Sequence, residues 1–388
     1  MALRVVISAG EVSGDQHLAR VVRALRELDP EVQVRGMGGK ECRAAGAELV
    51  VDCYKSGSAM GFLELFRSAR GIFSSFSAMS SLIRSWKPDV VILVDYPDFN
   101  LRLARVAHEA GCYVLYYIPP KVWAWRSGRV EKIKKLINQV AAIFPFEKSW
   151  YRQQGYDAVT YVGHPLLDEN RFVSPPQERD ETVLFMPGSR KFEIERMLLP
   201  MLIAFERMRK QMPRLRATVL LAENMSEEWA TQQAATAVSA DTLSAIDWKR
   251  GNVVPEMQRA RAAILKSGTC NLEGAIAELP FVSVYSGTLL AKSIVKAFVR
   301  MKEYSPVNIM KAGTVRELMR VRQDPVQMER ELLRVFEDGP VRQKMIADLR
   351  DVRSALFGVD DGAASTATAA QRVARIAVEA AQKTRRVA

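Results

Sequence analysis

Short apolar runs alternate with longer amphipathic segments along this chain, and this alternation limits the folds that the chain can adopt. Residues 90–94 are apolar at every position, as expected of a parallel strand that is buried on both faces of a sheet. In the first half, the alternation predicts strands and helices at residues 3–9, 15–28, 101–110, 113–117 and 140–144. It restarts in the second half at residues 182–186, 192–210, 216–221, 262–265, 271–277 and 281–285. This pattern predicts an α/β protein with two Rossmann-like, doubly wound parallel sheets.

The chain of 388 residues is too long for one ordinary hydrophobic core and suits two domains. A polar, proline-bearing stretch at residues 168–179 indicates a linker. We therefore expect an N-terminal domain over residues 1–167 and a C-terminal domain over residues 168–362. An alanine-rich helix within residues 363–388 is expected to pack back on the first domain.

The charge balance narrows the class of partner. The chain carries 56 Lys and Arg against 44 Asp and Glu, a net charge of +12. Such a surplus fits nucleic acid, an anionic membrane or a phosphorylated substrate. The sequence has no RNA-binding signature and no zinc-finger spacing, so nucleic acid is not expected. Basic residues recur beside apolar ones on predicted helices, which favours a lipid surface or phosphate groups.

The composition also bears on location and cofactors. No apolar run approaches the ~18 residues that a spanning helix needs, and the chain starts directly with a predicted strand. We expect a cytoplasmic protein that is peripheral on the inner face of the membrane. The four cysteines form no CxxC pair and the three histidines no HxxxH pair, so neither a disulfide framework nor a metal site is expected. Residues 60–86 and 289–302 are amphipathic, typical of core helices or of interfacial helices that touch lipid.

A glycine-containing segment follows the first predicted strand. Gly10 and Gly14 let a ligand approach the backbone closely, and the next helix presents free N–H groups. Alternatively, Ser13 or Asp15 caps that helix. The segment is neither GxGxxG nor a Walker motif, so a nicotinamide or ATP site is not favoured. The candidate ligand-binding residues of this segment are Gly10, Glu11, Ser13, Gly14 and Asp15.

Asp95 directly follows the buried run of residues 90–94. Ligand sites of open α/β sheets lie at the carboxyl ends of the strands, and a carboxylate there can accept a proton from an attacking hydroxyl. The alternative is that Asp95 or Asp98 caps the next helix. We assign the chemistry to Asp95 and the cap to Asp98. The spacing is DxxD, not the DxD of many metal-dependent sugar transferases.

A loop at residues 119–129 combines aromatic and basic residues, which suit sugar rings and phosphate. Its candidates are Trp123, Trp125, Arg126 and Arg129, and the alternative is a buried tryptophan pair. His164 precedes the linker and could face a cleft between the domains or have a structural role.

Two turns of the second half together resemble one site for a nucleotide diphosphate. Each joins a predicted strand to the N-terminus of a helix, where free N–H groups and hydroxyls favour phosphate. Ordinary capped helix starts, including a cap by Ser189, are the alternative. The candidate residues are Gly188, Ser189, Arg190, Ser267, Gly268, Thr269 and Glu273.

Taken together, these segments resemble the bacterial lipid-A-disaccharide synthase family, from residue 9 to the C-terminal helix. The matching segments, in order, are AGEVSGD (9–15), GMGG (36–39), AMGFLEL (59–65), PDVVILVDYPDFN (88–100), PPKVWAWRSGR (119–129), FPFE (144–147), VGHPL (162–166), MPGSRKFEIE (186–195) and SGTCNLE (267–273).

The resemblance implies a GT-B glycosyltransferase with a cleft between its domains. The implied reaction joins UDP-2,3-diacylglucosamine to 2,3-diacylglucosamine 1-phosphate, forming the β-1,6 lipid A disaccharide and releasing UDP. It implies that Asp95 is the base, that Arg190 is the essential arginine, and that Asn308 is functional. UDP-sugar is then a substrate, with no cofactor and no metal requirement. Alternatives are another GT-B enzyme (a sugar-nucleotide epimerase or a transferase with a different lipid acceptor) and a non-catalytic binding protein. The oligomeric state, including a homo-oligomer, stays open.

Overall fold

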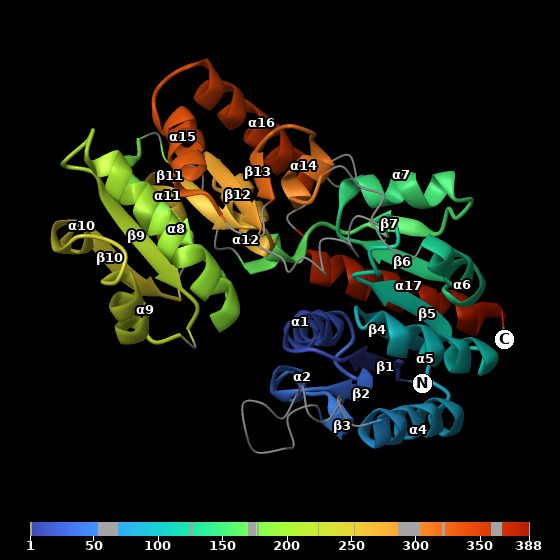
Figure 1. Ribbon diagram of the computed structural model, residues 1–388. Helices are drawn as coiled ribbons and strands as arrows, with labels where there is room; N and C mark the ends of the chain where they lie inside the picture. Colours follow the sequence, from blue (N-terminus) through green and yellow to red (C-terminus); the bar gives the residue numbers. More distant parts are fainter. Residues whose placement is uncertain are drawn as a thin grey trace. The chain divides into compact units, whose positions relative to one another are not determined.

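The computed structural model contains two compact units (Figure 1). The described residues are 2–52, 69–124, 127–169, 176, 178–223, 225–251, 253–285, 303–319, 323–357 and 367–387. The first unit comprises Met1–Glu169 and Leu356–Ala388, and the second comprises Asn170–Ala355. The sequence-based boundaries stand at residues 167 and 362.

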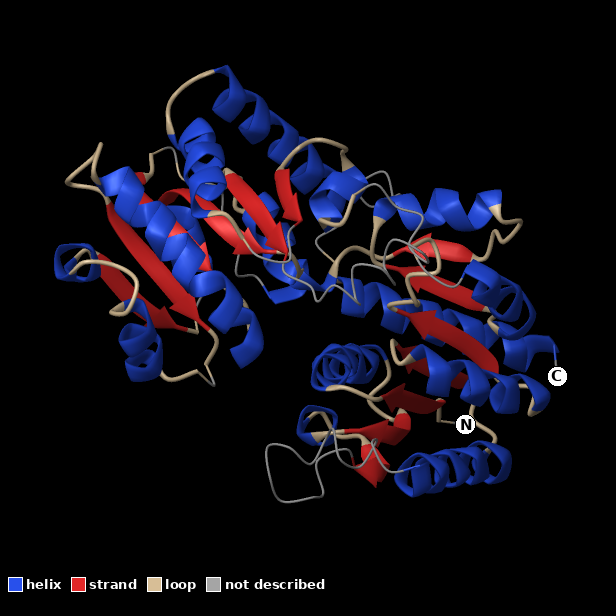
Figure 2. Cartoon of the chain, in the orientation of Figure 1, coloured by secondary structure: helices blue, strands red, loops and turns tan. Residues whose placement is uncertain are grey.

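The first unit is built on a seven-stranded sheet in which every recorded strand pair is parallel, in the order β3-β2-β1-β4-β5-β6-β7 (Figure 2). Its strands are β1 (Arg4–Ala9), β2 (Gln33–Gly38), β3 (Glu48–Asp52), β4 (Val90–Val94), β5 (Tyr113–Tyr117), β6 (Gln139–Ala142) and β7 (Val159–Tyr161). Its helices are α1 (Val12–Leu28), α2 (Lys40–Ala44), α4 (Ala69–Trp86), α5 (Pro97–Glu109), α6 (Val130–Leu136), α7 (Pro145–Gln153) and α17 (Ala369–Val387), with short 3-10 turns at Ser127–Arg129 and Pro165–Glu169. The direction of winding changes between β1 and β4, and ligands of such sheets bind beyond the strand ends at this switch point.

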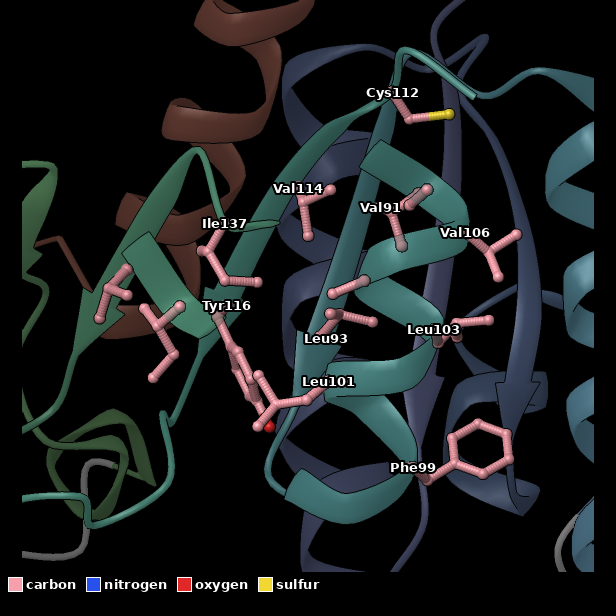
Figure 3. Close-up of a cluster of buried hydrophobic side chains, with 14 of the residues drawn as sticks. Val91, Leu93, Phe99, Leu101, Leu103, Val106, Cys112, Val114, Tyr116 and Ile137 are labelled. Carbon is pink, nitrogen blue, oxygen red and sulfur yellow. The ribbon is translucent and has the colours of Figure 1, made fainter. Parts of the chain in front are cut away.

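The core of the first unit lies between the sheet and its helices (Figure 3). All five residues of β4 are buried, as the uninterrupted apolar run predicts for a central parallel strand. Figure 3 shows Val91 and Leu93 of this strand near Leu103 and Val106 of α5. The face of α4 that carries Met79 and Ile83 packs against the same cluster.

The C-terminal helix α17 packs against α1 in the first unit. Asp168 fixes its start, because the carboxylate accepts hydrogen bonds from the backbone N–H groups of Ala369 (2.7 Å) and Ala370 (3.1 Å). Near its end, Arg385 donates to the Asp89 carboxylate (2.7 Å) and to the Ala2 carbonyl (2.8 Å). The C-terminal segment of the chain thus completes the first unit, although it is far from the rest of that unit in the sequence.

The second unit contains a six-stranded sheet, again parallel in every recorded pair, in the order β10-β9-β8-β11-β12-β13. Its strands are β8 (Asp180–Met186), β9 (Arg216–Leu221), β10 (Ile246–Arg250), β11 (Ala260–Lys266), β12 (Phe281–Tyr285) and β13 (Arg316–Met319). Its helices are α8 (Lys191–Arg209), α9 (Glu227–Ala234), α10 (Ala240–Ser244), α11 (Val253–Arg259), α12 (Thr269–Ile276), α14 (Pro306–Met310), α15 (Pro325–Phe336) and α16 (Pro340–Phe357), the last of which extends past the unit boundary. The switch point lies between β8 and β11. The prediction of two doubly wound parallel sheets is confirmed.

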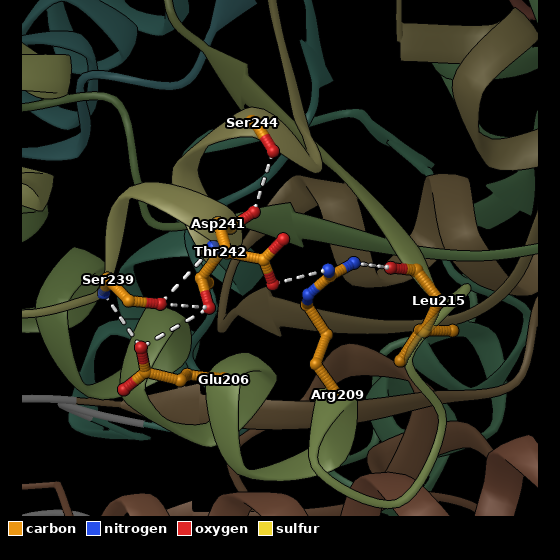
Figure 4. A network of polar contacts seen from close by, with 7 residues as sticks. All are labelled: Glu206, Arg209, Leu215, Ser239, Asp241, Thr242 and Ser244. Atoms are coloured by element: carbon orange, nitrogen blue, oxygen red, sulfur yellow. Dashed lines mark hydrogen bonds and ion pairs between the residues drawn. The ribbon is translucent and has the colours of Figure 1, made fainter.

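A polar network joins α8 to α10 in the second unit (Figure 4). Glu206 accepts hydrogen bonds from the Ser239 backbone N–H (2.7 Å) and the Thr242 hydroxyl (3.2 Å). The bond from the Ser239 backbone is the main reason that the pKa of Glu206 lies below its ordinary value. Arg209 pairs with Asp241 at 2.9 Å. The network secures the end of the long helix that begins at the Arg190 turn.

The two amphipathic stretches are only partly described. Within residues 60–86, the structure describes α4, on which Phe73 is 75% exposed. Residues 289–302 lie outside the described residues. None of the described helices is long and apolar enough to cross a membrane.

Candidate functional site

The β4–α5 turn holds Asp95 in an unusual backbone conformation. Asp95 and Tyr96 have φ angles of 46° and 45°, in the left-handed region that L residues other than glycine seldom adopt. Such conformations persist only where surrounding contacts enforce them, and they concentrate at functional sites. Both the strained backbone and the position at the end of β4 therefore indicate that Asp95 is a functional residue.

A buried amide enforces this conformation. Asn100 donates from Nδ2 to the Val94 carbonyl (3.0 Å) and to the Asp95 carbonyl (2.8 Å). Its Oδ1 accepts from the Ser8 hydroxyl on β1 at 2.7 Å. The Tyr116 hydroxyl adds a second bond to the Asp95 carbonyl at 2.8 Å. The network anchors the Asp95 backbone to both neighbouring strands of β4.

The environment of Asp95 changes its basicity. Partial burial raises the pKa of its carboxyl above the ordinary value, while the Tyr96 backbone N–H and the nearby Lys121 charge oppose this shift. A raised pKa makes the carboxylate a better proton acceptor than an exposed aspartate.

Gly10 has a packing reason to be glycine. A Cβ at this position would lie 2.5 Å from the Tyr96 ring, which stacks on Phe99 with ring centroids 5.4 Å apart. The loop after β1 therefore touches the turn that carries Asp95. Gly14, in the first turn of α1, is also tightly packed, with a Cβ position 3.2 Å from the Ala9 Cβ.

The alternative that Ser13 or Asp15 caps α1 is wrong. The helix begins at Val12 with Glu11 at the N-cap, so Ser13 and Asp15 lie inside its first turn. Asp15 is buried, and its carboxylate accepts backbone N–H bonds from residues 39, 41 and 42, at 2.7, 3.0 and 3.1 Å. It thus caps α2 instead, because the fold brings the start of α2 beside the first turn of α1.

The cap predicted for Asp98 is also wrong. Pro97 takes the first helical position of α5, so the N-cap falls on Tyr96 and no side-chain cap bond forms. Asp98 instead forms an ion pair with Arg129, whose side chain is only 15% exposed. This contact places Arg129 beside the helix that follows Asp95.

Trp123 is held by a buried carboxylate. Its Nε1 donates to Glu147 Oε1 at 2.9 Å, and the other oxygen of Glu147 accepts from the backbone N–H groups of Ile143 and Phe144. Burial raises the pKa of Glu147, although these hydrogen bonds oppose that shift. Trp125 and Arg126 lie outside the described residues.

His164 lies against the Phe144 ring, with ring centroids 5.2 Å apart, and its Nδ1 accepts from the Leu166 N–H at 3.2 Å. Burial lowers its pKa to about 3, so the ring is neutral at pH 7. These contacts fit the structural alternative, and a neutral imidazole can still donate one hydrogen bond.

A cavity of about 480 Å³ lies at the carboxyl ends of the central strands of the second unit. It is lined by Met186, Gly188, Ser189, Arg190, Leu220, Leu221, Ala222, Glu223, Gly251, Val253, Lys266, Ser267, Gly268, Thr269 and Cys270. The turns after β8 and β11, which the sequence predicts to form one site for a nucleotide diphosphate, line the same cavity. The N-termini of α8 and α12 begin at these turns, and helix N-termini favour anions.

Glu193 ties these turns together. Its Oε2 accepts from the backbone N–H groups of Ser189 (3.1 Å) and Arg190 (3.4 Å), so the Ser189 cap considered from the sequence is not formed. Its Oε1 pairs with Lys266 at 2.8 Å and with Arg190 at 3.5 Å. Burial favours the protonated carboxyl, but the Lys266 contact and the backbone bonds prevail, so the pKa of Glu193 lies below its ordinary value.

The two turn glycines differ in what surrounds them. Gly188 has φ +134°, and a Cβ there would lie 2.7 Å from Glu193 Oε2. Gly268 has an extended φ of 161°, and a Cβ there would meet no atom of the described residues within 4 Å. The contacts of the chain itself explain Gly188, whereas Gly268 leaves free space at the cavity.

Glu273 and Asn308 are not among the described residues that line this cavity. Glu273 is buried on α12. Asn308 is 3% exposed and bonds to the backbone of Val315 and to Glu317, at 2.8–2.9 Å. These contacts stabilise the turn between α14 and β13. The roles predicted for both residues stay predictions.

Sequence reasoning missed three residues. Asn100 and Glu193 lie a few residues after candidate motifs. The sequence spacing does not show that Asn100 contacts two backbone carbonyls or that Glu193 contacts Lys266. Lys266 directly follows the strand predicted at residues 262–265, and in the structure it is the last residue of β11. This position at the strand end is a signal that could have found it.

No group of three or more His, Cys, Asp or Glu that could hold a metal ion is found within the described ranges.

Comparisons with known proteins agree with this architecture. A family model for lipid-A-disaccharide synthetase matches residues 5–368. The lipid-A-disaccharide synthase of Syntrophus aciditrophicus is 35% identical over 365 residues, which cover 91% of this chain and 93% of the relative.

Solved structures show the same fold at low identity. The calicheamicin glycosyltransferase CalG4 is 14% identical, with a TM-score of 0.59 over 98% of each chain. A UDP-N-acetylglucosamine 2-epimerase is 12% identical, with a TM-score of 0.57 over 90% of this chain and 91% of the other. At such identities the likeness shows the fold alone, so transferase and epimerase are separated by the family match. The chain belongs to the lipid-A-disaccharide synthase family of glycosyltransferases and has the GT-B fold.

Proposed function

We propose that this family member transfers 2,3-diacylglucosamine from UDP to the 6-hydroxyl of 2,3-diacylglucosamine 1-phosphate. The product is the β-1,6 lipid A disaccharide, and UDP is released. The observation that carries the donor part is the convergence of the β8 and β11 turns on one cavity that is lined by Arg190 and Lys266.

The second unit holds the donor in this proposal. The N–H groups at the start of α12 face the diphosphate, and Arg190 adds a guanidinium that can bind two phosphate oxygens. The backbone N–H groups of Ser189 and Arg190 stay bonded to Glu193. Gly268 lets the ligand approach the backbone, since its Cβ position is open. These groups stabilise the negative charge that develops on the leaving diphosphate.

The first unit supplies the base. Asp95 accepts the proton of the acceptor 6-hydroxyl while the oxygen attacks the anomeric carbon of the donor. The bond from that carbon to the diphosphate oxygen breaks, and its electron pair leaves with UDP. A single displacement of this kind inverts the anomeric configuration. The hydrogen bonds from Asn100 hold the backbone that carries the carboxylate, and such a step depends on positioning of this kind.

Further parts of the proposal concern cofactors and location. No cofactor is required, and turnover needs no added metal ion, because helix N-termini and basic side chains meet the diphosphate charge. The protein works at the cytoplasmic face of the membrane, where its acylated substrates reside. The net charge of +12 supports contact with anionic lipid.

The decisive experiment incubates the purified protein with both acylated substrates and identifies the products by mass spectrometry, with and without EDTA. We expect the tetra-acylated disaccharide and an equal amount of UDP in both conditions. Free epimerised sugar nucleotide would replace the proposal with an epimerase. Donor binding without UDP release would indicate a non-catalytic binding protein, and loss of turnover with EDTA would overturn the metal-free step.

A further inference from the structure

The donor cavity contains two cations that are held very differently. Arg190 is 71% exposed, and its contact with Glu193 is long, at 3.5 Å. Lys266 is 21% exposed and pairs with the same carboxylate at 2.8 Å. Lys266 is also the last residue of β11, a central strand between β8 and β12. Its position is therefore defined by the sheet, whereas that of Arg190 is defined by a surface turn.

The position of Lys266 suits a phosphate group. It lines the cavity directly before Ser267 and Gly268, where the backbone is open to a ligand. An ammonium group has three N–H donors, and within the described residues Nζ uses one of them, on Glu193. The remaining donors can bind phosphate oxygens without breaking that pair.

Glu193 accounts for the orientation of this lysine. Its side chain is 7% exposed, and the bonds from the Ser189 and Arg190 backbone fix its second oxygen. A carboxylate so near a diphosphate would repel the ligand if it were alone, so its use here requires a bound cation. Glu193 balances the charge of Lys266 before the donor arrives and holds the ammonium group beside the turn that receives the diphosphate.

We propose that Lys266 is a catalytic residue that contacts the β-phosphate of the UDP donor, and that Glu193 is the positioning residue that orients it. When the bond between the anomeric carbon and the β-phosphate oxygen breaks, the electron pair stays on that oxygen, and Lys266 offsets the new charge. The acceptor hydroxyl forms the new bond to carbon and gives its proton to Asp95. This inference rests on the proposed donor site and adds the cation that serves the leaving group.

The first test compares the affinities of UDP and UMP, because only UDP carries a β-phosphate. We expect Lys266→Met to weaken UDP binding at least tenfold in calorimetry and to change UMP binding less than twofold. Lys266→Arg should restore part of the preference for UDP. Lys249→Met is a matched control, since Lys249 pairs with the buried Glu256 at 2.5 Å in the same unit and does not line the cavity. The control should keep the wild-type preference.

The second test asks whether Glu193 acts through Lys266. We expect Glu193→Gln to lower kcat at least tenfold, and to have little further effect when Lys266 is already Met. Equal, additive losses in both backgrounds would assign Glu193 a purely structural role. Thermal unfolding of each variant identifies any that fail to fold, and Glu193→Asp then serves as the milder change.

The outcomes separate the two proposals. A wild-type protein that does not bind UDP contradicts the donor site itself. A wild-type protein that binds UDP more tightly than UMP, together with a Lys266→Met variant that keeps this preference, overturns only the role of Lys266.

Discussion

The two strand-to-helix turns at the switch points share one device. In the first unit, Asn100 of α5 accepts a hydrogen bond from Ser8 on the strand beside β4, at 2.7 Å. In the second unit, Asn271 of α12 accepts one from Ser283 on the strand beside β11, at 2.8 Å. Both asparagines are fully buried. In each unit, this bond links the first turns of the helix to a neighbouring strand.

The two turns differ in their remaining contacts. Asn100 also donates to the carbonyls of Val94 and Asp95, around a turn with two positive φ angles. The contact recorded for Asn271 Nδ2 in the described part of the chain is a long one, 4.0 Å to the Cys270 sulfur. Its turn uses Gly268, which has an extended φ. A turn that must present a carboxylate needs side-chain support for a strained backbone, whereas a turn that must admit a ligand needs open space.

The largest expected effect concerns the carboxylate that the first turn presents. Asp95→Asn should lower turnover by about 10²–10⁴-fold, because the amide cannot accept the hydroxyl proton. UDP affinity should stay unchanged, since the donor contacts lie in the second unit. Product formation and UDP binding are measured on the same preparation. Asp98→Asn, three residues away, is the control, and normal turnover in Asp95→Asn would rule out the base.

The next largest effect tests the support of the strained turn. Asn100→Ala should cost about 2–3 kcal/mol of stability, because two carbonyls and the Ser8 hydroxyl each lose a buried partner. Asn271→Ala should cost about 1 kcal/mol, since fewer bonds are lost. Hydrogen exchange reports each unit separately. Equal losses of stability in the two variants would show that the Asp95 turn does not depend on additional side-chain support.

The two glycines of the donor cavity test whether one turn is tightly packed and the other leaves room for a ligand. Gly188→Ala should cost about 1–3 kcal/mol, because its Cβ would meet Glu193 in a left-handed conformation. Gly268→Ala should change stability by less than about 0.5 kcal/mol, since its Cβ meets none of the residues that the structure describes. It should nevertheless weaken UDP binding, which calorimetry measures. Unchanged UDP affinity in a stable Gly268→Ala variant would contradict close approach of the ligand at this turn.

The last difference between the two units is in acid sensitivity. All three histidines of the chain belong to the first unit. Burial lowers the pKa of His17 to about 4 and that of His164 to about 3, while the unfolded chain binds these protons near pH 6.5. Stability is therefore complete above pH 6.5 and is lost progressively as the pH falls towards 4 and 3, by up to ~1.4 kcal/mol per histidine and pH unit.

This difference is measured by hydrogen exchange of each unit between pH 7 and pH 5, corrected for the intrinsic pH dependence of exchange. The first unit should lose protection while the second changes little. His164→Gln keeps an acceptor for the Leu166 N–H and should remove part of the loss. Equal loss in both units would show that the histidines do not cause it.

The elements that the sequence predicted best are the central strands. The predicted bounds of β4, β5, β9 and β12 agree with the structure. These strands are apolar or β-branched at nearly every position, with Arg216 and Ser283 as exceptions, and parallel strands buried on both faces favour that pattern. Helix starts were less accurate, because a start depends on which residue becomes the N-cap. Helix α5 begins four residues before the predicted start, at Pro97.

The amino-acid sequence by itself determined the two doubly wound sheets and the motifs at their strand ends. It did so because burial periodicity and glycine turns are local properties of the chain. Only the tertiary structure decided that Asp15 caps α2, that Asn100 supports the Asp95 turn and that Glu193 orients Lys266. Each of these contacts is a hydrogen bond or ion pair that forms only when separate elements pack together. The local sequence pattern therefore does not predict which residues become partners.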